Sequence, residues 1–233
     1  MSRSPALIFD FDGLLVDTES TALQAWREQF AVHGVEFPLE VWNRYIGSQG
    51  SQQAMLGAVR DGGIEFDDAE LLAEWRGRHN GIVNSEHLRD GVREFLDDAV
   101  ARGLPMAVAS SATRDWLDVH LERVGVRGLF AAVCARDNGR VKPAPDIYLA
   151  ALEALGVGAG DAIAFEDSPN GVTAAKAADI FCVAVPNPVT SGLALDHADL
   201  RVSSFTEISV STLIELFRGG PGYAPPNVEA PAP

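Results

Sequence analysis

The sequence predicts an α/β protein: a doubly wound parallel sheet with an all-helical block inserted after its first strand. Three observations predict this class. From residue 91 onward, short apolar runs typical of buried strands alternate with segments of helical periodicity. Residues 18–85 carry helical patterns alone. Hydrophobic residues make up 47% of the 233-residue chain and charged residues 22%, which is typical of a globular protein with a substantial core.

The first expected strand is the apolar run 6–9, which leads directly into Asp10-Phe11-Asp12-Gly13. Helical patterns follow, and in the first of them Leu23, Trp26 and Phe30 share one face. Similar apolar faces recur to about residue 85, and no strand pattern interrupts them. We therefore expect residues 18–85 to form a helical unit.

After residue 91, helices and strands alternate strictly. The first helix runs through Val92 to Val100 and is closed by Gly103. The further elements expected are strands at 105–110, 131–135, 162–165 and 181–185, and helices through 116–124, 145–155 and 168–178. Because a helix separates each pair of strands, the strands should be parallel and helices should cover both faces of the sheet.

This arrangement makes the sheet core discontinuous. It comprises residues 1–17 and 86–218, and the helical insert 18–85 lies between them. The two connections lie close together, and paired connections of this kind can act as a hinge. The last segment, 219–233, is rich in Gly and Pro, and we expect it to be a disordered tail.

The net charge of the chain limits the classes of partner that it can bind. The formal charge of −15, from 33 acidic and 18 basic residues, opposes nucleic acid and anionic lipid, so we expect neither as a partner. No apolar run of about 18 residues occurs, and the first residues show no signal-peptide pattern. Cys134 and Cys182 lie in apolar runs, which indicates buried thiols in a reducing compartment. We predict a cytoplasmic protein that is a monomer or a weak dimer.

Polar side chains follow the expected strands at the edge where ligands bind in an open parallel sheet. Asp10 and Asp12 follow the first strand, Ser110 the second, and Glu166 and Asp167 the fourth, while Lys142 lies in the loop before a helix. Four carboxylates around one lysine would repel one another unless a hard divalent cation with oxygen ligands lay among them, and Mg²⁺ is the usual choice. The sequence therefore predicts a metal site, which together with Lys142 could receive a small phosphorylated substrate.

Local chain geometry suggests separate roles for these side chains. Gly13 lets the chain leave the extended conformation, so Asp12 can turn away from Asp10 and expose its backbone carbonyl. One carboxylate could then attack while the other exchanges protons. Ser110 precedes a helix that begins near Thr113, and free N–H groups at a helix start suit a phosphoryl oxygen.

Each of these residues alone has an ordinary structural explanation. Ser110 could be a helix cap, Lys142 a surface lysine, and Glu166-Asp167 the acidic start of a helix. Their joint occurrence at successive strand ends favours catalysis. The five histidines show no metal-ligand spacing and the four tryptophans lie at helical core spacing, so we interpret them as surface or packing residues.

Four segments, in order, resemble the motifs of the haloacid dehalogenase-like (HAD) hydrolase superfamily. They are Asp10-Phe11-Asp12-Gly13-Leu14-Leu15-Val16-Asp17-Thr18-Glu19, Ala109-Ser110-Ser111, Lys142-Pro143-Ala144-Pro145-Asp146 and Phe165-Glu166-Asp167-Ser168-Pro169-Asn170-Gly171. The insert resembles the small helical cap of subfamily I, which contains phosphosugar phosphatases and β-phosphoglucomutase. The resemblance implies a Rossmann-like core and a Mg²⁺-dependent phosphatase.

The resemblance also implies a role for each matching residue. Asp10 would attack phosphorus and form an aspartyl-phosphate, and Asp12 would protonate the leaving alcohol and then activate water. Ser110, Ser111 and Lys142 would bind the phosphoryl oxygens. The implied metal ligands are Asp10, the backbone carbonyl of Asp12, Asp167 and Glu166, the last directly or through water. Within the cap, we expect substrate contacts from Ser48, Gln49 and Arg76, although Arg76 could instead balance nearby acidic residues.

Other functions remain as alternatives. The presence of Asp12 argues against a dehalogenase, which needs no proton for its leaving halide. A β-phosphoglucomutase-type mutase shares all four motifs, but its pattern has a histidine where this chain has Ala22 and an arginine where it has Gly50. A receiver-like signalling switch is about half this length and lacks a helical insert. We favour a phosphatase acting on a small phosphomonoester, such as a sugar phosphate, over the mutase and over any non-enzymatic module.

Overall fold

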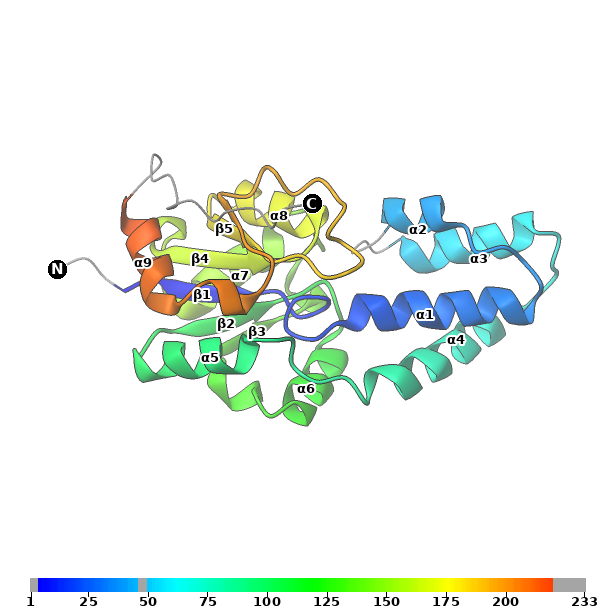
Figure 1. The fold of residues 1–233 in the computed structure, drawn as a ribbon, viewed down its shortest axis with the longest axis horizontal. Helices are drawn as coiled ribbons and strands as arrows, with labels where there is room; N and C mark the ends of the chain where they lie inside the picture. Colours follow the sequence, from blue (N-terminus) through cyan, green and yellow to red (C-terminus); the bar gives the residue numbers. More distant parts are fainter. Residues whose placement is uncertain (1–3, 46–49, 220–233) are drawn as a thin grey trace, which may run out of the picture.

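The structure, a computed structural model, describes residues 4–45 and 50–219. Within these residues, six strands form one parallel sheet in the order β3-β2-β1-β4-β5-β6 (Figure 1). The strands are β1 (Ala6–Phe9), β2 (Met106–Ala109), β3 (Ala132–Cys134), β4 (Ala162–Glu166), β5 (Phe181–Ala184) and β6 (Leu200–Arg201). Strand β1 lies between β2 and β4, so the direction of strand order reverses beside it. Ligands bind at such a switch point, outside the carboxyl ends of the strands.

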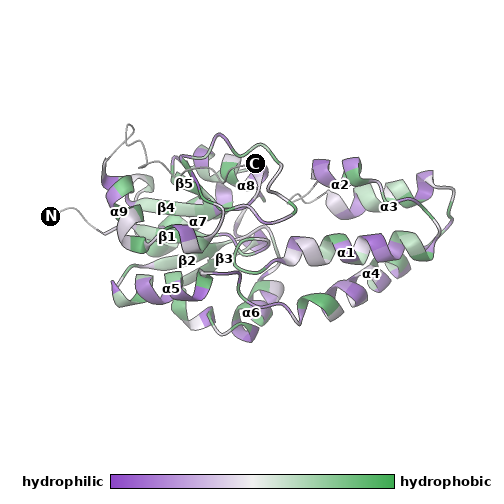
Figure 2. Ribbon diagram, viewed as in Figure 1, coloured by the Kyte–Doolittle hydropathy of each residue, from purple (hydrophilic) through white to green (hydrophobic). Residues whose placement is uncertain are grey.

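Helices cover both faces of the sheet, as predicted. They are α5 (Val92–Ala101), α6 (Arg114–Arg123), α7 (Asp146–Leu155), α8 (Pro169–Ala177) and α9 (Val210–Gly219). Alternate residues of β1 point to opposite faces: Leu7 and Phe9 pack with α5, α6 and α9, and Ala6 and Ile8 pack with α7 and α8. Figure 2 shows the strands in mostly hydrophobic colours, while the helices mix hydrophobic and hydrophilic residues. The sheet is therefore buried on both faces.

Four helices follow β1 and extend away from the carboxyl end of the sheet (Figure 1). They are α1 (Thr18–Val32), α2 (Leu39–Tyr45), α3 (Ser51–Asp61) and α4 (Asp68–Val83). Asp17 and Asp67 cap α1 and α4 by accepting backbone N–H groups. The helices bury their own cluster, in which the rings of Trp26 and Trp75 stack 4.9 Å apart. We call residues 18–85 the cap and propose that they form a unit distinct from the core.

The two connections between the cap and the core lie side by side. Val16 and Leu88 form an antiparallel bridge, and the Arg89 N–H donates to the Leu15 carbonyl at 2.9 Å. The expected proximity of these connections is confirmed.

Two elements near the C-terminal end of the described chain, β6 and α9, differ from the prediction made from the sequence. Strand β6 and helix α9 were not predicted. Strand β6 has only two residues, too few for a period-2 pattern, whereas α9 has apolar residues at helical spacing, Val210, Leu213, Ile214 and Phe217, which do indicate a helix. Helix α9 ends at Gly219, the first residue of the predicted tail, and residues 220–233 lie outside the described residues. Among the described helices, none is long and apolar enough to cross a membrane.

Candidate active site

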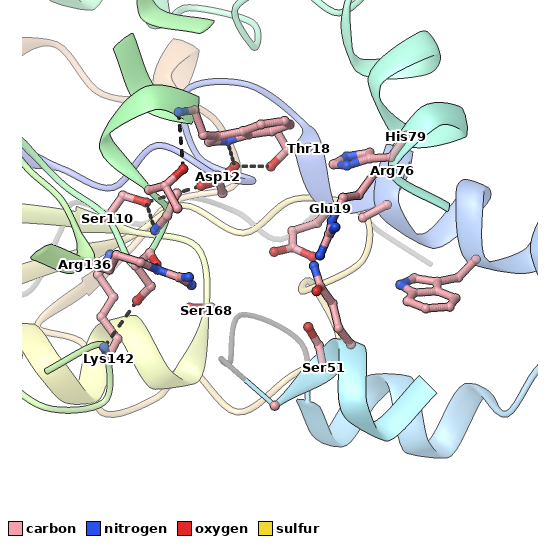
Figure 3. Close-up of a pocket in the computed structure, with 18 of the residues that line it drawn as sticks. Asp12, Thr18, Glu19, Ser51, Arg76, His79, Ser110, Arg136, Lys142 and Ser168 are labelled. Carbon is pink, nitrogen blue, oxygen red and sulfur yellow. Dashed lines mark hydrogen bonds between the residues drawn. The ribbon is translucent and has the colours of Figure 1, made fainter. Parts of the chain in front are cut away.

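A cavity of about 1040 Å³ lies between the carboxyl ends of the strands and the cap. Asp12, Ser110, Arg136 and Lys142 line it from the core, and other side chains face them from the cap (Figure 3). Of the six polar residues predicted at the strand ends, all except Glu166 line this cavity.

Asp10 follows β1 directly, and its backbone N–H donates to the Phe165 carbonyl at 3.0 Å, which fixes the residue beside β4. Its side chain is buried, and the Lys142 Nζ lies 2.6 Å from Asp10 Oδ1. Burial raises the pKa of Asp10 to about 7, although the ammonium of Lys142 opposes the rise. Burial therefore disfavours the ionised form of Asp10, and Lys142 is the cation that favours it.

Asp10, Glu166 and Asp167 form a buried cluster in which one carboxylate oxygen from each lies within 4.8 Å of the others. Burial, followed by the charges of Asp10 and Glu166, raises the pKa of Asp167 well above its usual value. Oxygen donors of this kind suit a hard divalent cation, whose charge would relieve the repulsion. The cluster therefore fits a metal ion, and for this reason we refer to Asp10, Glu166 and Asp167 as the metal-binding cluster.

Asp12 occupies a separate environment. Its Oδ1 accepts hydrogen bonds from Thr18 Oγ1 at 3.0 Å and from Trp116 Nε1 at 2.9 Å, and its Oδ2 accepts from Ser110 Oγ at 3.2 Å. Its carboxylate is not part of the metal-binding cluster. The two aspartates are thus held apart, as the presence of Gly13 suggested.

Gly13 is required at this turn. Its φ of +77° is in the left-handed region, and a Cβ would lie 2.4 Å from Asp167 Oδ2. A side chain at position 13 would clash with Asp167 and Asn187, so only glycine fits there.

Lys142 is buried between two carboxylates. Its Nζ lies 2.6 Å from Glu166 Oε1 as well as from Asp10, and it is 5.2 Å from the Tyr148 ring centroid. Burial lowers the pKa of Lys142, but the charges of Asp10 and Glu166 outweigh burial and raise it overall. Lys142 is therefore a fixed positive charge in the cavity wall.

Glu166 has a second set of partners that the sequence did not reveal. Tyr148 Oη donates to Glu166 Oε1 at 2.7 Å, and the Asp167 backbone N–H donates to Oε2 at 3.2 Å. Its side chain is fully buried. Both oxygens are thus engaged, so Glu166 anchors Lys142 in addition to facing the metal-binding cluster.

The serines after β2 connect these groups. Ser110 touches Asp12, while Ser111 Oγ accepts from the Lys142 backbone N–H at 3.2 Å. Thr113 caps α6 just beyond, and the Arg136 Nε donates to the Ser111 carbonyl at 3.2 Å. Both serines line the cavity beside Lys142.

The sequence analysis did not identify two residues, Asn187 and Arg89, that connect the loops after strands β1 and β5 by hydrogen bonds. Asn187 Nδ2 donates to Asp167 Oδ2 at 2.7 Å and to the Gly13 carbonyl at 3.2 Å. Arg89 donates to carbonyls of both the loop after β1 and the loop after β5. Asn187 follows β5, so the rule that found the other strand-end residues would have found it too.

The cap side of the cavity contains one of the three predicted cap residues. Arg76 lines the wall, whereas Ser48 and Gln49 lie outside the described residues. Ala22 and Gly50, the positions that depart from the mutase pattern, also line it.

Glu19 and His79 are further cap residues in this wall, and neither was predicted for the site. Burial, followed by the charges of Asp12 and Asp10, raises the pKa of Glu19 to about 8. Burial lowers the pKa of His79 to about 4, so this ring is neutral near pH 7. The tryptophans and histidines were interpreted as surface or packing residues. Trp116 does pack against the core but also donates a hydrogen bond to Asp12, and His79 also lines the cavity.

Gly171, in the first turn of α8, is expected to be essential for the Lys142 anchor. A Cβ there would lie 1.8 Å from Glu166 Oε2, so the Gly171→Ala variant must displace the carboxylate from Lys142 and Tyr148. Breaking a buried ion pair costs about 3 kcal/mol, and we expect a loss of that size in the free energy of unfolding, measured in urea.

The matched control is Gly77→Ala in α4, where a Cβ meets nothing within 4 Å. That change should be neutral or stabilising by up to about 1 kcal/mol, as is usual for Gly to Ala in a helix. Equal stability of Gly171→Ala and the wild type would show that Glu166 is not confined as described.

Comparison with known families matches residues 7–185 to a family described as haloacid dehalogenase-like hydrolase. YhcW of Bacillus subtilis (strain 168) is 38% identical over 211 residues, covering 90% of this chain and 96% of that protein. The fructose-1-phosphate phosphatase YqaB of Escherichia coli (strain K12) is 32% identical and covers 78% of this chain and 97% of its own.

Among solved structures, CbbY from Rhodobacter sphaeroides in complex with phosphate is 27% identical. It has a TM-score of 0.74 and covers 91% of this chain and 99% of its own. The similarity thus extends over both the sheet core and the inserted helices.

Proposed function

The chain belongs to the haloacid dehalogenase-like hydrolase family, and from this premise we propose that it is a phosphatase that hydrolyses a small phosphomonoester through an aspartyl-phosphate on Asp10. The observation that carries the proposal is the arrangement of its two aspartates. Asp10 lies beside Lys142 in the metal-binding cluster, and Asp12 is held separately by three hydrogen-bond donors.

In the first step, an Asp10 carboxylate oxygen forms a bond to phosphorus as the bond from phosphorus to the ester oxygen breaks. Asp12 gives its proton to the departing ester oxygen. In the second step, Asp12 takes a proton from water as that water attacks phosphorus, which frees Asp10 and releases phosphate. Lys142, Ser110 and Ser111 hold the phosphoryl oxygens, and positioning and charge supply most of the rate.

We propose Mg²⁺ as the metal. Asp10, Asp167 and the Asp12 backbone carbonyl would hold it, with Glu166 in direct contact or through water. When bound, it supplies positive charge against the phosphate and the surrounding carboxylates. Without the metal ion, the single positive charge of Lys142 would have to balance two carboxylates and a phosphate dianion.

For the substrate we propose a sugar phosphate or a related metabolite. Trp26, Trp42 and Trp75 line the cap side of the cavity, and they give this wall an apolar character that suits the carbon skeleton of a small metabolite. Glu19 and Arg76 add an acceptor and a cation for hydroxyl or acidic groups. The YqaB relative, by its name, acts on fructose 1-phosphate.

Cys134 and Cys182 are buried free thiols, which supports a cytoplasmic location.

The phosphatase and the mutase differ in what accepts the phosphoryl group from Asp10. A mutase must retain a bisphosphate while it turns round, and in this chain Ala22 and Gly50 stand at the two lining positions where the mutase pattern has a histidine and an arginine. We therefore expect water to be the acceptor.

A phosphorus NMR time course with β-glucose 1-phosphate and a trace of the 1,6-bisphosphate tests this proposal. Inorganic phosphate should appear faster than any positional isomer. Build-up of glucose 6-phosphate without free phosphate would replace the phosphatase with the mutase.

A further inference from the structure

Trp116 is a core residue that contacts both Asp12 and the cap. It lies in the first turn of α6, and its indole Nε1 donates to Asp12 Oδ1 at 2.9 Å. On its other side, its ring stacks on His79 of α4, with centroids 5.5 Å apart and planes at 24°. The described cap and core thus meet at a ring that also binds a carboxyl group of the site.

The orientation of the indole is fixed from two sides. His120 of α6 packs against the Trp116 ring at 4.0 Å, and His79 covers it from the cap. His79 is itself held by Thr21 Oγ1 at 3.1 Å and by stacking on Trp75 at 5.2 Å. The Trp116 ring is therefore in contact with the cap through His79 and with its own helix through His120.

The hydrogen bond has a chemical consequence because an indole N–H can only donate. Thr18 and Trp116 both donate to Oδ1 of Asp12, and Ser110 lies beside Oδ2. When Asp12 carries a proton, an oxygen that accepts two hydrogen bonds is the poorer place for it. The proton is thus directed to Oδ2, next to the serine expected to bind the phosphoryl group.

We propose that Trp116 is a positioning residue for Asp12, and that His79 holds it in place when the cap covers the core. Proton transfer to the leaving group is then aligned only with the cap over the site. This inference rests on the proposed phosphatase function and adds to it a link between cap position and the acid–base group.

Trp116→Phe separates this role from packing, because it keeps a ring for His79 and His120 but removes the N–H. The test compares kcat/KM for p-nitrophenyl phosphate with kcat/KM for a sugar or simple alkyl phosphate. Nitrophenolate leaves without being protonated, whereas an alkoxide needs a proton from Asp12. Since general acid catalysis contributes about 100-fold or more, a misplaced acid should cost the alkyl phosphate at least about tenfold more than the nitrophenyl ester.

His79 provides a second pair of variants. His79→Ala removes the ring that covers Trp116 and should give the same selective loss. His79→Phe keeps a stacking ring and should restore much of the ratio between the two substrates. Val119→Ala, at an exposed position of α6, the helix that carries Trp116, should leave the hydrolysis of both substrates unchanged. Circular dichroism and thermal melts establish that each variant is folded.

Equal losses with both substrates in Trp116→Phe and His79→Ala would overturn the inference and leave these rings a packing role alone. That outcome, in an enzyme whose wild-type activity disappears in Asp10→Asn, leaves the proposed function intact. A wild-type protein that hydrolyses neither ester would overturn the proposed function and the inference together. A selective loss for the alkyl phosphate supports both.

Discussion

Asp10→Asn is expected to lower kcat by more than about a thousandfold while the protein remains folded. An amide nearly matches a carboxylate in shape but is a poor nucleophile, and a thousandfold loss corresponds to about 4 kcal/mol of barrier lowering. The fold should tolerate the change because the amide oxygen can still accept from Lys142, which lies 2.6 Å from Asp10 Oδ1. Glu166, whose Oε1 also lies 2.6 Å from the Lys142 Nζ, remains as a charged partner, so the buried ammonium stays paired in this variant.

Steady-state phosphate release and thermal melts of the wild type and Asp10→Asn measure these two effects. Asp161→Asn, an exposed position before β4, serves as the matched control and should retain full activity. Activity of Asp10→Asn within tenfold of the wild type would exclude Asp10 as the nucleophile.

Removal of divalent metal is expected to abolish turnover. Asp10, Glu166 and Asp167 are buried together, and a phosphate dianion must enter beside them. Dialysis against EDTA should therefore reduce the rate to background, and Mg²⁺ should restore it. Ca²⁺ should bind yet support little turnover, because its larger and more variable coordination shell disturbs the in-line geometry.

A thermal melt gives a second measurement that does not depend on activity. Mg²⁺ should raise the melting temperature of the wild type, since it relieves repulsion among the carboxylates, and should raise that of Asp167→Asn much less. Full activity after exhaustive chelation, with no change in melting temperature on adding Mg²⁺, would contradict the metal site.

The strands and helices of the core could be predicted from the sequence, because the hydrophobic patterns of strands and helices differ clearly in that part of the chain. Strands β1 to β5 lie where the apolar runs placed them. Their ends bring Asp10, Ser110 and Asp167 to one cavity, and the loop before α7 adds Lys142. Strand order did not have to be known for this, since the carboxyl ends of parallel strands meet at one edge. The two-residue β6 was beyond any periodic signal.

The hydrogen-bond partners of individual side chains were harder to predict than the helices and strands on which these residues lie. Trp116 has the helical spacing of a core residue, and only the packing of α6 against the loop after β1 turns its N–H toward Asp12. Tyr148 likewise reads as an apolar residue of α7, yet its hydroxyl binds Glu166. Such contacts join residues about 20 to 100 positions apart, which no local pattern records.

The cap was the least predictable part. Its helices follow from their apolar faces, but Glu19 and His79 reach the cavity through the way α1 and α4 pack on each other and on the core. Selectivity for the substrate depends on that packing, and the roles of Arg76, Ser48 and Gln49 stay predictions.

The central claim is that the phosphoryl group passes to Asp10 and then to water, and a rapid-quench experiment with the Asp12→Asn variant tests it most directly. Nitrophenolate needs no proton to leave, so p-nitrophenyl phosphate should still phosphorylate Asp10, whereas the second step lacks its base. We predict a burst of one nitrophenolate per active site, little further turnover, and a phosphoryl group on the peptide that contains Asp10. Release of phosphate with no labelled protein at any time, or a phosphoryl group on another residue, would contradict the account.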